Sequence, residues 1–249
     1  MYSVRKSTMK HGTTNFNVLL FILTITCYLT WQFGINYFII FCSSSIIHLI
    51  IESGLALSGM RKSVVYVYGK KLPKTIEIVI KSMTEGPAYC VPAYFVADQF
   101  IAGNFLLGIV SAVIVVGFSA HYLGWSDKRD LEKGELPLIS RRAMNKPKAV
   151  MLLALINTGC LTALFLMPSP YRMHAFIYII AYSLLVMLFY LINYNLGVRM
   201  VEIYDHDTKE FKQPGPLFQA AGLAYDSAYE MAVLVSPAYW LTFYLGFFK

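Results

Sequence analysis

Four ionisable residues that stand inside apolar runs are the strongest chemical feature of the sequence. His48 and Glu52 belong to the run IIHLIIESG, and because they are one helical turn apart their side chains share a face and can hydrogen-bond. Glu85 in KSMTEGPAYCVPAYF and Glu230 in DSAYEMAVLVSPAYW each precede a proline within a further apolar run. An imidazole beside a carboxylate can hold, deliver and recover a proton near neutral pH. These four residues are the candidate catalytic residues.

The chemistry expected of them is proton transfer to a poorly reactive substrate. Carboxylates that meet in a poorly solvated cavity cannot all be ionised, so at least one of them would be neutral. A neutral carboxylic acid in a dry pocket is a strong general acid, as protonation of an alkene or an epoxide requires. Glu85 or Glu230 would be the acid, and His48 with Glu52 would be the relay or the final base.

Aromatic and polar side chains at similar depths are the candidate substrate-binding residues. Aromatic ring faces can stabilise a cationic intermediate, and amides add uncharged hydrogen-bonding groups. The set comprises Tyr89, Tyr94, Asn157, Asn193, Tyr194, Asp226, Tyr229, Tyr239 and Trp240.

Structural interpretations compete with these roles. His48 and Glu52 could be a hydrogen-bonded pair that joins helices, and Asp226 could cap a helix start, where the helix dipole favours an acid. Asp98 and His121 lie near the ends of apolar runs and are interpreted as interface residues. A metal site formed by His48, Glu52, Glu85 and Glu230 is a further alternative, but no metal is predicted, since one histidine among carboxylates lacks a characteristic ligand spacing.

The elements that must position these groups are predicted to be membrane-spanning helices. Of the 249 residues, 57% are hydrophobic and 14% charged, whereas about a quarter of the residues are charged in an average soluble domain. Apolar runs of about 17 to 25 residues, each long enough to cross a bilayer, recur along the chain. The seven predicted spans are Asn15–Phe33, Asn36–Leu57, Ile76–Gln99, Ile101–Trp125, Ala149–Met167, Met173–Val198 and Leu223–Phe248. The fold class expected is therefore an all-α integral membrane protein, a seven-helix bundle.

The distribution of basic residues gives the bundle a direction. The net charge of +7 does not indicate nucleic acid, because nearly all Lys and Arg fall before the first span or after the second, fourth and sixth. Only Arg172 and Lys249 fall on the other side. This bias predicts a cytoplasmic N-terminus in a multi-pass protein of the cytoplasmic membrane or the endoplasmic reticulum. The four cysteines all lie within the predicted spans and show no CxxC spacing, so neither a disulfide framework nor a zinc site is indicated.

The chain is interpreted as one transmembrane domain, residues 1–249, with an internal boundary. A charged cytoplasmic loop at 126–148 separates spans one to four (1–125) from spans five to seven (149–249). The segments around Glu85 and Glu230 align without a gap as S-x-x-E followed seven residues later by P-A-Y and an aromatic residue. Depth counting at 1.5 Å per residue places Glu52 about 6 Å, His48 about 12 Å, and these two glutamates about 9 to 13 Å from the cytoplasmic boundary. The four groups are expected to share one layer.

The motifs HLIIE, MTEGPAY and SPAYWLTF resemble those of the emopamil-binding protein family, membrane proteins that include the sterol Δ8–Δ7 isomerase. The resemblance covers about residues 15 to 125 and implies a helical bundle in which His48, Glu52 and Glu85 handle protons. The additional spans and the second acid also give an architectural likeness to integral-membrane terpene cyclases, whose usual motifs are absent.

The function expected is a membrane isomerase or cyclase that protonates an alkene or epoxide of a terpenoid or sterol-like lipid without a cofactor. The expected partners are that lipid and the membrane. A non-catalytic lipid or sterol sensor and a proton-coupled transporter, for which buried acids and proline-broken helices are equally expected, are the alternatives.

Overall fold

A computed structural model describes residues 2–8, 13–57, 66–68, 70–132, 138–143, 147–205, 207–230 and 236–248. Most of these residues are helical. The helices are α1 (Thr13–Phe33), α2 (Asn36–Leu57), α3 (Lys74–Glu85), α4 (Pro87–Ile101), α5 (Phe105–Glu132), α6 (Pro147–Leu166), α7 (Ser169–Asn195), α8 (Pro216–Glu230) and α9 (Ser236–Tyr244). The strands are β1 (Tyr2–Thr8), β2 (Tyr66–Val67), β3 (Lys70–Lys71), β4 (Leu138–Ala143), β5 (Arg199–Tyr204) and β6 (Phe211–Lys212).

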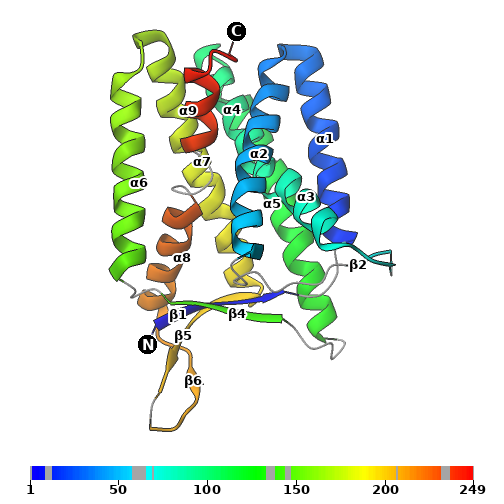
Figure 1. Ribbon diagram of the computed structural model, residues 1–249, viewed down its shortest axis with the longest axis vertical. Helices are drawn as coiled ribbons and strands as arrows, with labels where there is room; N and C mark the ends of the chain where they lie inside the picture. The colour runs from blue at the N-terminus through cyan, green and yellow to red at the C-terminus, as the bar shows by residue number, and fades with distance from the viewer. Residues whose placement is uncertain are drawn as a thin grey trace.

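The helices form an upright bundle that stands on a small β-sheet, and the C-terminus lies at the opposite end from the sheet (Figure 1). Four helical segments are long and apolar enough to cross a membrane: Thr14–Phe33, Asn36–Gly54, Phe105–Ser126 and Tyr171–Asn195. The expected helical membrane protein is confirmed at this level. Within the described residues, four of the seven predicted spans thus meet the length and hydropathy of a span.

One of the predicted spans is an interrupted helix. The span expected at Ile76–Gln99 is divided at Gly86 into α3 and α4, since Pro87 has no N–H with which to continue the backbone ladder. The proline of the P-A-Y motif in this span, Pro92, lies inside α4. The span expected at Leu223–Phe248 contains most of α8 and all of α9, and residues 231–235 between them lie outside the described part of the chain.

The element order strengthens the internal similarity seen in the sequence. A strand, two long helices, two short strands and two further helices occur in β1 to α4, and the same order occurs in β4 to α9, with α5 between the two series. The aligned glutamates are Glu85, the last residue of α3, and Glu230, which stands in α8 directly before the undescribed residues 231–235. The similarity therefore extends well beyond the 15 aligned residues.

The sheet was not predicted from the sequence. Its strand order is β4-β1-β5-β6, with every neighbouring pair antiparallel, and β2 pairs with β3 in a separate hairpin. The strand β1 thus pairs the start of the chain with β4, which lies in the predicted loop at 126–148. Hydropathy does not reveal short polar strands, because the strands with which they pair lie far away in the sequence.

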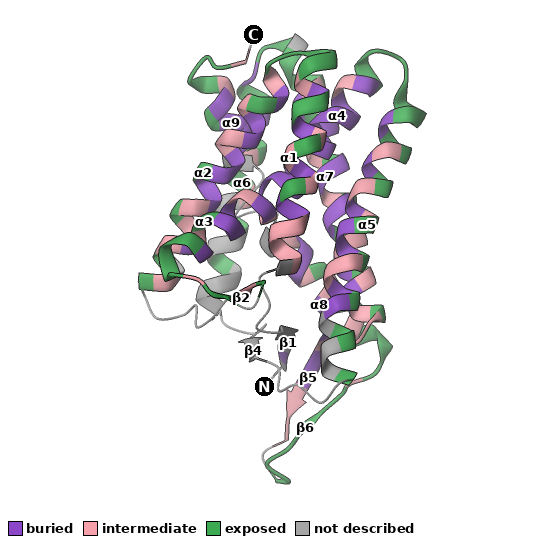
Figure 2. Ribbon diagram, turned by 90° about the vertical axis from the view of Figure 1, so that its right-hand side faces the viewer, coloured by how far each residue is buried: buried purple, intermediate pink, exposed green. Residues whose placement is uncertain are grey.

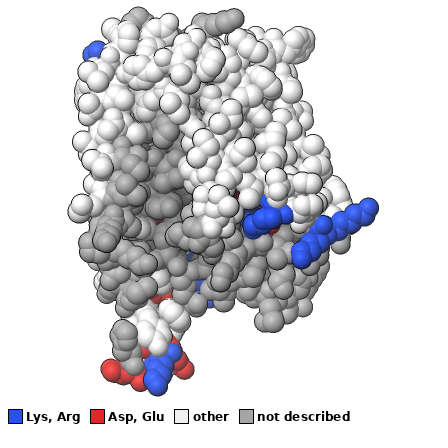
Figure 3. All heavy atoms as spheres, viewed as in Figure 1, with Lys and Arg blue, Asp and Glu red and all other residues white. Residues whose placement is uncertain are grey.

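The bundle is apolar both inside and outside. Buried residues face one another across α2, α4 and α7, while large hydrophobic side chains of α1, α5 and α7 lie on the outer surface (Figure 2). On the face drawn in Figure 3, the charged atoms gather near the sheet end and on the hairpin below it, apart from a single basic group at the far end. A broad surface without charge between these ends suits a hydrocarbon environment. All four cysteines are free, as expected.

Candidate functional site

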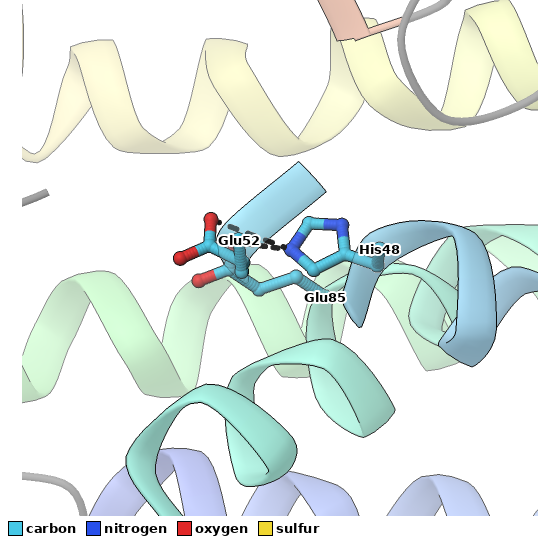
Figure 4. Close-up of side chains that lie close together, drawn as sticks. All are labelled: His48, Glu52 and Glu85. Atoms are coloured by element: carbon cyan, nitrogen blue, oxygen red, sulfur yellow. Dashed lines mark ion pairs between the residues drawn. The ribbon is translucent and has the colours of Figure 1, made fainter. Parts of the chain in front are cut away.

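Three of the four candidate catalytic residues meet in the interior of the bundle. The Nε2 atom of His48 lies 3.3 Å from Oε2 of Glu85 and 3.7 Å from Oε1 of Glu52. Figure 4 shows the imidazole pointing toward both carboxylates. His48 and Glu52 come from adjacent turns of α2, and Glu85 is the last residue of α3. The i, i+4 spacing therefore produced one contact, and tertiary packing produced the other.

The break between α3 and α4 brings Glu85 to α2. A Cβ atom placed on Gly86 would lie 2.9 Å from the carbonyl oxygen of Ser44 and 3.4 Å from Cβ of His48. Only a residue without a side chain permits this approach. Below the junction, Glu77 forms ion pairs with Lys81 (3.1 Å) and Lys74 (3.2 Å) that stabilise α3.

The burial of the three groups differs in a way that suits proton transfer. His48 and Glu52 are almost fully buried, whereas the side chain of Glu85 is 34% exposed. Buried ionisable groups in an apolar bundle are costly and are functional candidates. An imidazole in contact with two carboxylates can pass a proton from one to the other, with the accessible carboxylate exchanging it.

The same three side chains could also hold a divalent cation. Their ligand atoms, one imidazole nitrogen and two carboxylate oxygens, all lie within 4.8 Å of one another. Imidazole and carboxylate together suit several transition metals. The sequence analysis considered a metal site formed by these residues together with Glu230, but found no characteristic ligand spacing, because Glu85 is 33 residues beyond Glu52.

Glu230 and Tyr229 form the end of α8, and their side chains lie outside the described part of the chain. Asp226, one turn earlier, is fully buried and accepts a hydrogen bond of 2.8 Å from Nη1 of Arg199, the first residue of β5. The guanidinium of Arg199 lies 4.3 Å from the centre of the Tyr190 ring. Asp226 therefore joins α8 to the sheet, a role that neither the substrate-binding nor the capping interpretation predicted.

Four more of the candidate substrate-binding residues make contacts that do not include His48, Glu52 or Glu85. Tyr89 packs edge-on against the rings of Tyr182 and Phe189. Asn193 donates a hydrogen bond to the Phe189 carbonyl within α7, and Tyr194 lies beside Gly222 of α8. Asn157 is a half-buried residue of α6.

Tyr94, Tyr239 and Trp240 belong to a different cluster near the end of the bundle opposite the sheet. Tyr94 is nine residues beyond Glu85, a rise of about 13 Å along a helix. Its ring lies 4.7 Å from the imidazole of His174, a residue to which the sequence analysis gave no role. His174 also contacts Asp98, which had been interpreted as an interface residue. Depth counting extended to the far ends of the spans would have placed Asp98 and His174 in the same layer.

Comparison with known proteins adds no assignment: no family model matches the chain, and no curated protein or solved structure is significantly similar to it.

Proposed function

We propose that the protein is an isomerase or cyclase in the membrane, one that protonates an alkene or epoxide of a terpenoid or sterol-like lipid. The observation that carries the proposal is the contact of His48 with both Glu52 and Glu85 inside an apolar bundle. Such a contact can supply a proton to carbon and remove another without a cofactor. The motif likeness to the emopamil-binding protein family supports the same chemistry.

Each residue has a defined role in this proposal. Glu85, the most accessible of the three, takes a proton from solvent and donates it to the substrate. His48 receives the proton lost from the neighbouring carbon, and Glu52 stabilises the resulting imidazolium. The carbocation formed between the two steps is stabilised by aromatic ring faces, among which Tyr89, one turn beyond Glu85, is the nearest candidate.

The proposed placement in the membrane follows the charge distribution. The sheet end carries most of the basic residues and therefore faces the cytoplasm. In this placement α3 and α4 together cross the bilayer once, and α8 and α9 together cross it once. Seven crossings with a cytoplasmic N-terminus result. Reporter fusions at the β5–β6 hairpin and at the C-terminus, on opposite sides of the bilayer, test this placement.

Solvent deuterium provides the test of the chemistry. Membranes containing the protein are incubated in D₂O with a panel of unsaturated and epoxide terpenoids and Δ8 sterols, and the products are analysed by mass spectrometry. Protonation of a double bond leaves one deuterium on carbon, while a proton from the substrate is released. Glu85→Gln and His48→Ala are expected to lower deuterium incorporation by about 10²- to 10⁴-fold. The exposed Glu132→Gln on α5 is the control and retains full activity.

Three results would reject the proposal. Full incorporation in both Glu85→Gln and His48→Ala removes these residues from the reaction. Activity that is lost on dialysis against a chelator and restored by Zn²⁺ or Mn²⁺ assigns metal chemistry to the same three side chains. Tight binding of an unmodified lipid, with no product from any substrate in the panel, indicates the sensor alternative.

The interrupted helix formed by α3 and α4 favours a second candidate, a proton-coupled transporter. Broken helices and buried acids are common where transporters bind substrate and protons. A substrate flux in proteoliposomes that depends on a pH gradient and is abolished by Glu85→Gln identifies this function. The absence of such flux, together with deuterium incorporation, excludes it.

A further inference from the structure

A second cluster of titratable side chains lies near the end of the bundle opposite the sheet. The Nε2 atom of His174 lies 2.8 Å from Oδ1 of Asp98, and its Nδ1 atom lies 2.6 Å from the hydroxyl of Tyr239. The hydroxyl of Tyr37 donates a 2.6 Å hydrogen bond to the other oxygen of Asp98. These four residues come from α2, α4, α7 and α9. The cluster is a continuous hydrogen-bonded chain through four helices.

The two ends of this chain have different surroundings. The side chain of Asp98 is 34% exposed, whereas that of His174 is 13% exposed and Tyr239 is 2% exposed. Asp98 can therefore exchange a proton with water at the boundary, while the hydroxyl of Tyr239 lies in the dry interior. The cluster therefore extends from the partly exposed Asp98 to the buried Tyr239.

Within the described residues, the groups that face the Asp98–His174 pair are phenols. They are Tyr37 from α2, Tyr94 from α4 and Tyr239 from α9, and Tyr178 and Tyr171 of α7 lie next to Tyr239. The guanidinium of Arg172 is bound to the Met167 carbonyl at 2.8 and 3.1 Å. In this part of the chain the ion-pair partner of Asp98 is His174.

We propose that Asp98, His174 and Tyr239 form a proton relay, which takes up a proton at Asp98 and presents one at the hydroxyl of Tyr239. Before proton uptake, the Nε2–H of His174 faces Asp98, and Tyr239 donates to Nδ1. One proton taken up from water through Asp98 makes His174 doubly protonated, so that its Nδ1–H donates to the oxygen of Tyr239. The phenol keeps its own proton, which turns from Nδ1 toward the interior, so one proton is taken up and none is released.

The direction of the Tyr239 hydroxyl is the property that the relay changes. While the Nδ1 atom of His174 has no proton, Tyr239 donates to it; once His174 is doubly protonated, Nδ1 donates to the phenol oxygen and the phenol proton turns elsewhere. A phenol that donates and a phenol that accepts have different C–O stretching frequencies. Infrared difference spectroscopy can therefore follow the relay without any substrate.

The experiment compares spectra of the full chain in lipid nanodiscs between about pH 9 and about pH 5, the range in which imidazoles titrate. A tyrosine C–O difference band is expected in the wild type. It is lost in Tyr239→Phe, which keeps the ring packing, and in Asp98→Asn and His174→Gln. Tyr244→Phe, an exposed tyrosine of the same helix, retains the band, and size-exclusion chromatography verifies that each variant is folded.

Either of two results overturns the relay: a band that persists in Tyr239→Phe, or a band that is lost there but unchanged in both Asp98→Asn and His174→Gln. Because the measurement needs no turnover, it is independent of the deuterium assay. Loss of activity in Glu85→Gln with the infrared band intact would support both proposals, and an intact band in an inactive wild type would reject only the proposed function.

Discussion

Gly86→Ala tests whether the junction between α3 and α4 holds the proton-transfer site together. The new Cβ atom would lie 2.9 Å from the carbonyl oxygen of Ser44, a backbone atom that cannot rotate away. Ordinary contact begins at 3.4 Å, so α2 and the junction must separate by about 0.5 Å, the kind of overpacking that costs about 1–3 kcal/mol. Alanine has a higher helix propensity than glycine, which offsets at most about 1 kcal/mol of this cost. The free energy of unfolding is therefore expected to fall by about 1–2 kcal/mol.

The assay is thermal unfolding of the protein in nanodiscs, followed by tryptophan fluorescence. A loss of about 1–2 kcal/mol corresponds to a Tm lower by roughly 2–8 °C for a chain of this size. The control is Gly54→Ala on α2, where an added Cβ atom meets nothing within 4 Å, and its Tm should equal or exceed that of the wild type. Deuterium incorporation by Gly86→Ala should also fall about tenfold or more, since His48 and Glu85 move apart.

The reasoning fails if Gly86→Ala melts at the same temperature as Gly54→Ala. If Gly86→Ala is destabilised but retains full activity, the junction does not hold the proton-transfer site together, because separating α2 from the α3–α4 junction would then not affect proton transfer.

Two further predictions concern the sheet end. Asp226→Asn leaves the guanidinium of Arg199 buried without its carboxylate partner and should lower the free energy of unfolding by about 3–5 kcal/mol. The double variant with Asp226→Leu and Arg199→Met should recover much of the lost Tm. A double variant that melts no higher than Asp226→Asn would contradict this. The hydrogen bond from Lys212 and the Asp207 N–H together hold the pKa of Asp205 well below its ordinary value of 3.8. The local order of the β5–β6 hairpin should accordingly be fully present above about pH 4 and be lost as the pH falls further, as seen by faster amide hydrogen exchange. Asp205→Asn should abolish that pH dependence, and an unchanged acid transition would refute the assignment.

The local features of the site were predictable from the sequence. An apolar composition and a scarcity of charge require that most helices be apolar on both their inner and outer faces, so a helical membrane protein followed from hydropathy alone. The contact between His48 and Glu52 followed from helical periodicity, because residues four apart share one face whatever the tertiary structure.

Long-range packing decided the remaining features. Counting depth placed Glu85 in the correct layer, but only the close approach of Gly86 to Ser44 brought its carboxylate to His48. The same depth argument grouped Tyr94 and Tyr239 with that site, whereas they surround His174 about two turns farther along the bundle. Rise along a helix fixes the height of a residue, but not which neighbouring helix it faces.

The sequence alone therefore determined the composition of the helices and the pairing within α2. The tertiary structure decided that a predicted span breaks at Gly86, that three of the candidate residues meet, and that Asp98 and His174 form a cluster of their own. The physical reason is that helical periodicity and hydropathy are properties of neighbouring residues, whereas contacts between helices depend on which small residues allow two backbones to approach.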